Sequence, residues 1–97
     1  MIVERTTYRA KSFCQQAAAD FVKEVWEQIE FPHPFRIHVP VIGPGDVIYH
    51  EMEFEDFAER QAFWAGFWAR PEIPEWSEKW KELTESGGGS ELLRPIE

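Results

Sequence analysis

The sequence predicts an α+β fold in which one antiparallel sheet carries its helices on one face. Segments in which apolar and polar residues alternate, typical of half-buried strands, are separated by segments in which apolar residues recur every three or four positions, typical of amphipathic helices. In chain order these segments predict strand, helix, strand, strand, helix, short helix and strand. The 97 residues suit one domain, and we assign residues 1–97 to it.

The first predicted strand covers residues 2–9, which alternate and are rich in β-branched side chains. A helix is expected from Ser12, because an apolar stripe follows at helical spacing and ends before Pro32. The stripe predicts that one side of this helix packs on the core.

Residues 35–42 predict the second strand and residues 47–54 the third, joined as a hairpin by the turn at 43–46. Pro40 has no amide hydrogen to donate, so the second strand is expected at an edge of the sheet.

The second main helix is expected to begin after Asp56, which forms an N-terminal capping box with Glu59, and to continue to Ala69. Its aromatic residues Phe63, Trp64, Phe67 and Trp68 predict packing in the core or at a dimer contact, and the alternative is a hydrophobic ligand pocket under the helices. Pro74 suits the first turn of a short third helix.

The C-terminal segment combines flexibility with a short strand in our prediction. Residues 87–90, Gly-Gly-Gly-Ser, are interpreted as a mobile loop of flexible-linker type. They are not interpreted as a phosphate-binding loop, because no lysine follows them and no helix starts after them. Residues 92–96 are expected to form the last strand, with Pro95 near its end.

The order of elements is that of the ferredoxin-like βαββα(α)β fold. We expect the sheet face opposite the helices to be largely apolar and to contain two histidines. The residues expected on this face are Tyr8, His38, Ile42, Ile48, His50, Met52 and Phe54. An exposed face of this kind marks an interaction site. The prediction is a homodimer whose two sheets meet as a dimeric α/β barrel.

Composition limits the classes of partner. The net charge of −8 argues against nucleic acid and anionic membranes, which attract clustered Lys and Arg. The N-terminus lacks the apolar core of a signal peptide and no apolar run approaches about 18 residues, so a cytoplasmic protein is expected. The single cysteine, Cys14, has no partner for an internal disulfide.

Short matches along nearly the whole chain resemble the NIPSNAP family of the dimeric α/β-barrel superfamily. In the first strand the matching residues are Glu4, Thr7 and Tyr8. Further matches, in the family's order, are Ile42-Gly43, Ile48, His50, Glu53, Phe54, Ala58-Glu59-Arg60, Pro71 and Trp76. The resemblance implies a homodimeric barrel of undetermined biochemical role.

The departures from the family pattern lie on the strands. Thr6 stands where the family tends to have arginine, so a Glu-Arg-Tyr group is not intact, and Met52 replaces a frequent tryptophan. Arg5 and Glu51 replace aliphatic residues on neighbouring strands. We expect these two side chains to pair beneath the helices, where losing one partner would cost about 3–5 kcal/mol.

A cleft between the sheet and its partner is the candidate site for a small molecule. The candidate lining residues are Glu4, Tyr8, Arg36, His38, His50 and Met52. Histidine can act as a base, and tyrosine or a carboxylate can orient a substrate. The alternative is that His38 and His50 are hydrogen-bonded interior residues at the dimer seam. A metal would need a third ligand beside them, for which Glu4 is the best candidate, so neither metal nor cofactor is predicted.

Three functions stay open from the sequence. The first is a homodimer that binds a small hydrophobic or aromatic molecule in the barrel. The second, implied by the resemblance, is a cofactor-independent monooxygenase like those of a sister group in the same superfamily, which oxidise polycyclic aromatic substrates. The third is a dimerisation module with a filled barrel. A cavity of about 300 Å³ or more would favour the first two.

Overall fold

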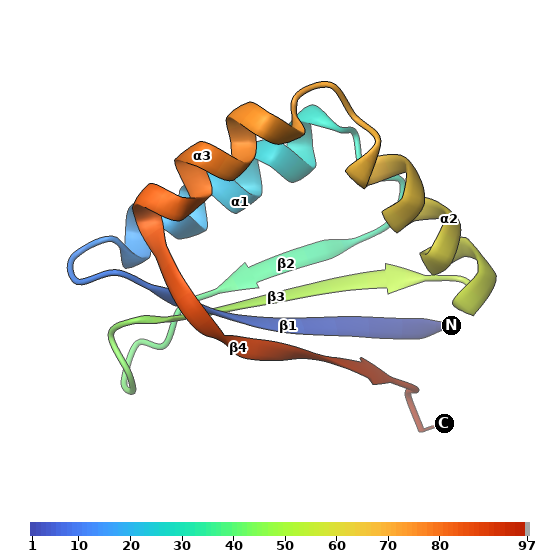
Figure 1. The fold of residues 1–97 in the computed structure, drawn as a ribbon. Coiled ribbons are helices and arrows are strands. Elements are labelled where there is room, and N and C mark those ends of the chain that lie inside the picture. Colours follow the sequence, from blue (N-terminus) through green and yellow to red (C-terminus); the bar gives the residue numbers. More distant parts are fainter. Residues whose placement is uncertain (97) are drawn as a thin grey trace.

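A four-stranded antiparallel sheet with three helices on one face forms the structure, a computed structural model that describes residues 1–96 (Figure 1). The elements are β1 (Ile2–Ala10), α1 (Gln15–Gln28), β2 (Phe35–His38), β3 (Val47–Phe54), α2 (Phe57–Trp68), α3 (Ile73–Leu83) and β4 (Thr84–Leu93). The strands lie in the order β2-β3-β1-β4. This architecture confirms the predicted ferredoxin-like α+β fold. Within residues 1–96, no helix is long and apolar enough to cross a membrane.

The core lies between α1 and β3. The stripe of α1 is buried as predicted, with Phe21, Val22, Val25 and Trp26 each at most 7 % exposed. These side chains pack against Met52 and Phe54 of β3 in one cluster. Burial of a side chain of this size stabilises the fold by about 1.5–3 kcal/mol, so the α1–β3 contact fixes the helix on the sheet.

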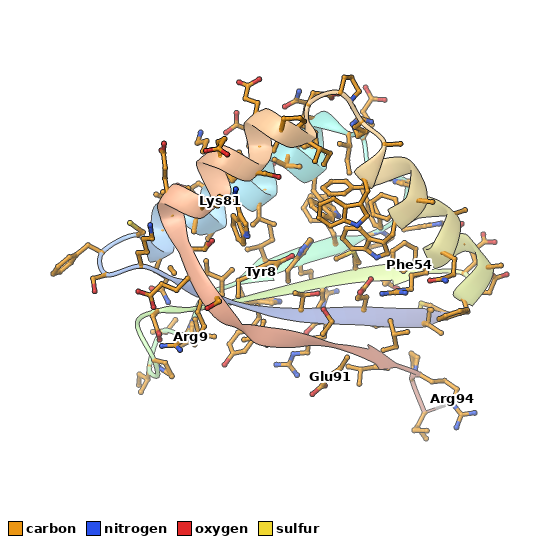
Figure 2. All side chains as sticks on the ribbon, in the orientation of Figure 1. Tyr8, Arg9, Phe54, Lys81, Glu91 and Arg94 are labelled. Carbon is orange, nitrogen blue, oxygen red and sulfur yellow. The ribbon has the colours of Figure 1, made fainter. Side chains whose placement is uncertain are left out.

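The prediction of which sheet face the apolar residues occupy was wrong. Ile48, Met52 and Phe54 are almost completely buried on the helix face of β3. Tyr8 points to the same side, whereas Arg9 and Glu91 project from the opposite face (Figure 2). The helices cover only one face, and the apolar stripe of α1 requires an apolar floor there. The charged strand residues other than Glu4 are therefore directed to the opposite face.

The open face of the sheet is therefore charged. Register pairs place Arg36 beside Glu51, Glu51 beside Arg5, and Arg5 beside Glu91. These four residues, called the charge row below, run across all four strands with alternating sign. The other two residues expected on an apolar face, His38 and Ile42, do not form one. His38 is exposed at the end of β2, and Ile42 lies beyond this strand in the loop. β2 is shorter than predicted, and Pro40, which cannot donate a ladder hydrogen bond, lies just past its end.

Arg5 and Glu51 pair as predicted, with Arg5 Nε 3.9 Å from Glu51 Oε1. They do so on the open face and not beneath the helices, and their side chains are 44 % and 34 % exposed. Pairs this exposed contribute about 0–1 kcal/mol. The expected cost of 3–5 kcal/mol for breaking a buried pair therefore does not apply to them within the single chain.

The glycine-rich segment belongs to β4, contrary to the predicted loop. Gly89 and Ser90 pair with Thr7 and Thr6 of β1, and the register shifts between Thr7 and Arg9. At this bulge Gly88 has φ +84°, and a Cβ atom there would collide with the carbonyl of Thr7. Glycine is thus required for the two backbones to approach, a role that composition does not distinguish from flexibility.

The start of α2 confirms the predicted capping box. The carboxylate of Asp56 accepts a hydrogen bond from the Glu59 amide at 2.8 Å, and Glu59 accepts one from the Glu55 amide at 2.9 Å. His33, in the loop before β2, places Nε2 2.8 Å from the Glu59 carboxylate. Despite its aromatic residues, α2 has no fully buried residue among those described. Phe63, Trp64 and Phe67 pack against the core cluster, but a space remains beside them.

Candidate functional site

That space is a cavity of about 450 Å³ between the sheet and the three helices. It lies on the helix face, where the alternative interpretation of the aromatic residues of α2 places a pocket, and not between the sheet and a partner, where the candidate cleft was expected. The lining residues are Glu4, Thr6 and Tyr8 of β1, Phe21, Val22, Val25 and Trp26 of α1, Arg60, Trp64, Phe67 and Trp68 of α2, Ile73, Trp76, Ser77 and Trp80 of α3, and Ser90 of β4.

Aromatic side chains form the walls of the cavity, and they include all five tryptophans of the chain. Trp26 stands near the centre of this group, with its ring centroid 5.4 Å from that of Phe67 and 5.9 Å from that of Trp64. On the α3 side, Trp80 meets Tyr8 edge to face at 4.9 Å. Offset and perpendicular ring pairs at these distances stabilise a rigid wall.

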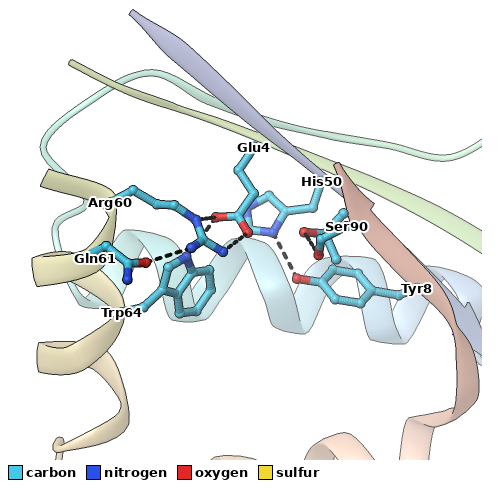
Figure 3. A network of polar contacts seen from close by, with 8 residues as sticks. Glu4, Tyr8, His50, Arg60, Gln61, Trp64 and Ser90 are labelled. Atoms are coloured by element: carbon cyan, nitrogen blue, oxygen red, sulfur yellow. Dashed lines mark hydrogen bonds and ion pairs between the residues drawn. The ribbon is translucent and has the colours of Figure 1, made fainter. Parts of the chain in front are cut away.

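A buried carboxylate with three hydrogen bonds forms one polar corner of the cavity. Glu4 is 2 % exposed and accepts hydrogen bonds from Arg60 Nε at 3.2 Å and Arg60 Nη2 at 2.9 Å. It also accepts one from Trp64 Nε1 at 2.7 Å (Figure 3). Arg60 and Trp64 lie four residues apart, on one side of α2. The forked ion pair therefore ties α2 to the middle of the sheet.

A second polar group joins β1 to β3. The hydroxyl of Tyr8 is 3.2 Å from Nδ1 of His50 (Figure 3). Burial lowers the pKa of His50 to about 4. Burial, reinforced by the negative charge of Glu4, raises the pKa of the Tyr8 phenol far above its usual range. Both side chains are therefore uncharged at neutral pH.

A contact with the ring of Trp26 helps to stabilise His50 in the protein interior. Its Nε2 atom and Nε1 of Trp26 are buried without a hydrogen-bond partner among residues 1–96. The two rings are perpendicular with centroids 4.5 Å apart. Perpendicular contact of this kind is favourable between an aromatic face and a polarised ring edge, and it partly replaces the missing hydrogen bonds.

Hydroxyl groups complete the polar surface. Thr6 Oγ1 and Ser90 Oγ lie 3.0 Å apart across the β1–β4 ladder, and either can be the donor. Both residues line the cavity. Ser90 reaches this position only because the glycine-rich segment pairs with β1 as a strand.

Of the candidate residues, Glu4 and Tyr8 line the cavity, and His50, completely buried, contacts Tyr8 but is not itself part of the lining. Met52 is completely buried beneath the helices and is not part of the cavity lining. Arg36 and His38 project from the open face, away from the cavity. Since His38 and His50 lie on opposite faces, they cannot share a metal ion. No group of three or more His, Cys, Asp or Glu in residues 1–96 is arranged to hold one.

Sequence reasoning did not assign Arg60, Thr6 or Ser90 to a site, and it named Trp64 only in the alternative of a pocket under the helices. The four-residue spacing of Arg60 and Trp64 places both on one side of a helix and was available as a signal. Their partner Glu4 is 56 and 60 residues away in the chain. No local pattern announces a contact over that separation.

The arrangement can orient a small molecule against aromatic walls and hydrogen-bond one polar group of it. A histidine with a pKa of about 4 is a weak base at neutral pH. The Tyr8–His50 pair is therefore better suited to holding a hydrogen bond than to removing a proton from a bound molecule.

Solved structures share this fold. Protein Atu4242 from Agrobacterium tumefaciens is similar with a TM-score of 0.84 at 24 % identity, covering 99 % of this chain and 94 % of its own. A NIPSNAP-like domain protein from Burkholderia xenovorans, described as uncharacterised, has a TM-score of 0.83 at 23 % identity, covering 98 % and 84 %. A putative antibiotic biosynthesis monooxygenase from Deinococcus radiodurans has a TM-score of 0.69 at 11 % identity, covering 100 % and 94 %.

Identities this low establish the common fold and not a common reaction. No curated protein matches the chain. The NIPSNAP family model matches residues 3–97, which is nearly the whole sequence. The chain therefore belongs to the NIPSNAP family, as the short matches along its strands and helices predict.

Proposed function

We propose that this protein binds a small hydrophobic or aromatic molecule in the cavity between the sheet and the helices. The observation that carries the proposal is the cavity of about 450 Å³, walled by tryptophans around a few hydrogen-bonded polar groups. Ligand sites commonly combine such a volume, of about 300–1,000 Å³, with mostly apolar walls. A purely structural module would be expected to fill this space with its own side chains.

The half-buried helix α2 supports the same proposal. Trp68 is 63 % exposed although it lines the cavity. A bound aromatic molecule would remove more of this apolar surface from water, at about 25 cal/mol per Å². The ligand would in this way complete a core that the chain leaves open.

Tryptophan fluorescence is the direct test, because all five tryptophans line the cavity. Titration with 2-naphthol is expected to give a saturable change in emission. Ser77→Phe, which places a ring in the cavity, should weaken binding at least about tenfold, the effect of about 1.4 kcal/mol.

Glu82→Phe is the matched control, since Glu82 is exposed on the same helix and does not line the cavity. It should bind 2-naphthol like the unmodified protein. The absence of saturable binding to the unmodified protein, or equal affinity in Ser77→Phe, would contradict the proposal.

We also propose that the open face of the sheet is covered by a second copy of the chain. The charge row alternates Arg36, Glu51, Arg5, Glu91 across the sheet. A two-fold axis that reverses the row places each charge opposite one of the other sign, so the face is complementary to itself. An apolar face, which was the original reason to expect a homodimer, is not required.

Sedimentation equilibrium tests this proposal through the two central charges of the row. Glu51→Arg places like charges against each other in the pair and should weaken the dimer at least about tenfold. The exchanged variant Arg5→Glu/Glu51→Arg again places opposite charges against each other across the two copies and should recover most of the affinity. A monomeric unmodified protein at micromolar concentration, or a dimer unaffected by Glu51→Arg, would refute it.

Cofactor-independent oxidation of an aromatic substrate is a second candidate function. The apolar cavity with the Tyr8 hydroxyl in its lining favours it, because this hydroxyl can orient the oxygen of an aromatic substrate. Its test is oxygen uptake by the purified protein with anthrone as substrate. Uptake that Tyr8→Phe abolishes would support catalysis, and no uptake above the buffer rate would exclude this substrate.

A further inference from the structure

The charges that line the cavity cancel each other. Glu4 and Arg60 are the only ionisable acid and base among its described lining residues apart from the phenol of Tyr8. They form one ion pair, with Arg60 Nη2 2.9 Å from Glu4 Oε2. The net charge facing a ligand is therefore zero, although the whole chain carries −8.

We infer that the Glu4–Arg60 ion pair determines the charge specificity of the cavity, so that its ligand is an uncharged aromatic molecule with a hydroxyl or carbonyl group. The inference rests on the proposed ligand-binding function and adds the chemical class of the ligand. It excludes carboxylates, phosphates and ammonium compounds as preferred ligands.

The positive charge that an anion would meet is already paired with a carboxylate. Arg60 directs Nε and Nη2 to Glu4, and its Nη1 donates to Gln61 Oε1 at 2.9 Å. An anion would also lose its hydration shell next to the carboxylate of Glu4. In a partly dehydrated cavity such like-charge proximity is more unfavourable than in water.

A cation meets the opposite difficulty. Aromatic walls attract cations through their ring faces, so the five tryptophans alone would favour an ammonium group. The guanidinium of Arg60 repels it at the same place, and Glu4 already accepts hydrogen bonds from both Arg60 and Trp64. No uncompensated carboxylate among the described lining residues remains for a cation.

A neutral polar group does have partners. Thr6, Tyr8 and Ser90 contribute hydroxyls to the lining. A hydroxyl can donate or accept a hydrogen bond by rotating, and the Thr6–Ser90 contact of 3.0 Å permits either direction. A ligand hydroxyl or carbonyl could join this group without leaving a buried charge unpaired.

Three naphthalene probes of similar size test the inference by fluorescence titration: 2-naphthol, 2-naphthoate and 2-naphthylmethylammonium. At pH 7, 2-naphthol should bind at least about tenfold more tightly than either ion, a difference of about 1.4 kcal/mol. Tighter binding of 2-naphthoate or of the ammonium probe overturns the inference but leaves the proposed function intact. Failure of all three probes to bind counts against the proposed function itself.

Variants that unbalance the pair provide the second readout. Glu4→Gln keeps the shape of the side chain but leaves Arg60 uncompensated, so the preference should change to 2-naphthoate by at least about tenfold. Arg60→Gln should change it to the ammonium probe, and Glu4→Gln/Arg60→Gln should return it to 2-naphthol.

Near-ultraviolet circular dichroism establishes that each variant is folded before titration. An unchanged preference in folded Glu4→Gln would show that the pair does not set specificity. If a variant fails to fold, the three probes on the unmodified protein still decide between the outcomes.

Discussion

Arg60→Leu is expected to lower the free energy of unfolding by about 3–5 kcal/mol, because it leaves a carboxylate buried without its ion-pair partner. The side chain of Glu4 is 3 % exposed and that of Arg60 is 23 % exposed, so water cannot readily replace the lost guanidinium. One hydrogen bond, from Trp64, would remain. Urea unfolding followed by circular dichroism measures the difference.

Arg9→Leu is the matched control for this prediction. Arg9 Nη2 lies 2.9 Å from Asp46 Oδ2, the same separation as in the Arg60–Glu4 pair, but the two side chains are 48 % and 38 % exposed. Loss of the Arg9–Asp46 pair should lower the free energy of unfolding by less than about 1 kcal/mol. The double variant Glu4→Leu/Arg60→Leu should regain much of the stability, since an apolar pair can replace a buried ion pair. Equal losses in Arg60→Leu and Arg9→Leu would show that burial does not set the cost.

Stability is expected to fall by about 2 kcal/mol between pH 7.5 and pH 5 because of His50. Burial lowers the pKa of His50 in the folded chain from an ordinary 6.5 to about 4. Between these two values the unfolded chain binds a proton that the folded chain does not. The contribution is therefore fully present above about pH 6.5 and is lost as the pH falls towards 4, with a full loss on the order of 3 kcal/mol.

Urea unfolding at pH 7.5 and pH 5 tests this prediction in three proteins. His50→Gln removes the titrating group and should remove about 2 kcal/mol of the pH dependence, whatever it does to stability at pH 7.5. His38→Gln removes an exposed histidine of the open face and should leave the pH dependence unchanged. The same pH dependence in His50→Gln as in the unmodified protein would refute a buried neutral His50.

The candidate site shows where reasoning from sequence ends. Period-two alternation placed Ile48, His50, Met52 and Phe54 on one face correctly, but it cannot say which face the helices cover. That choice depends on the sum of burial over both layers, where α1 presents Trp26 and Phe21 to β3. Once the face was reversed, the predicted cleft moved from the dimer seam to the space beneath the helices.

The strand residues and the helix residues of the site differ in how far they could be predicted. Glu4, Tyr8 and His50 were candidates because polar side chains in alternating strands stand out from their neighbours. Arg60 was recognised only as a residue near the start of a helix. Its role follows from its contact with Glu4, which is distant in the chain.

By itself, the sequence determined the order of the elements, the capping box that starts α2 and the membership of the NIPSNAP family, because these depend on local spacing and chemistry. The pairing of Arg5 with Glu51 followed from the predicted topology, which makes their two strands neighbours. Only the tertiary structure decided which sheet face is covered, that residues 87–90 form a strand, and that Glu4 and Arg60 neutralise each other beside a cavity. These features arise from the packing of segments distant in the chain. Burial and desolvation there act on the assembled whole and leave no signal in any one segment.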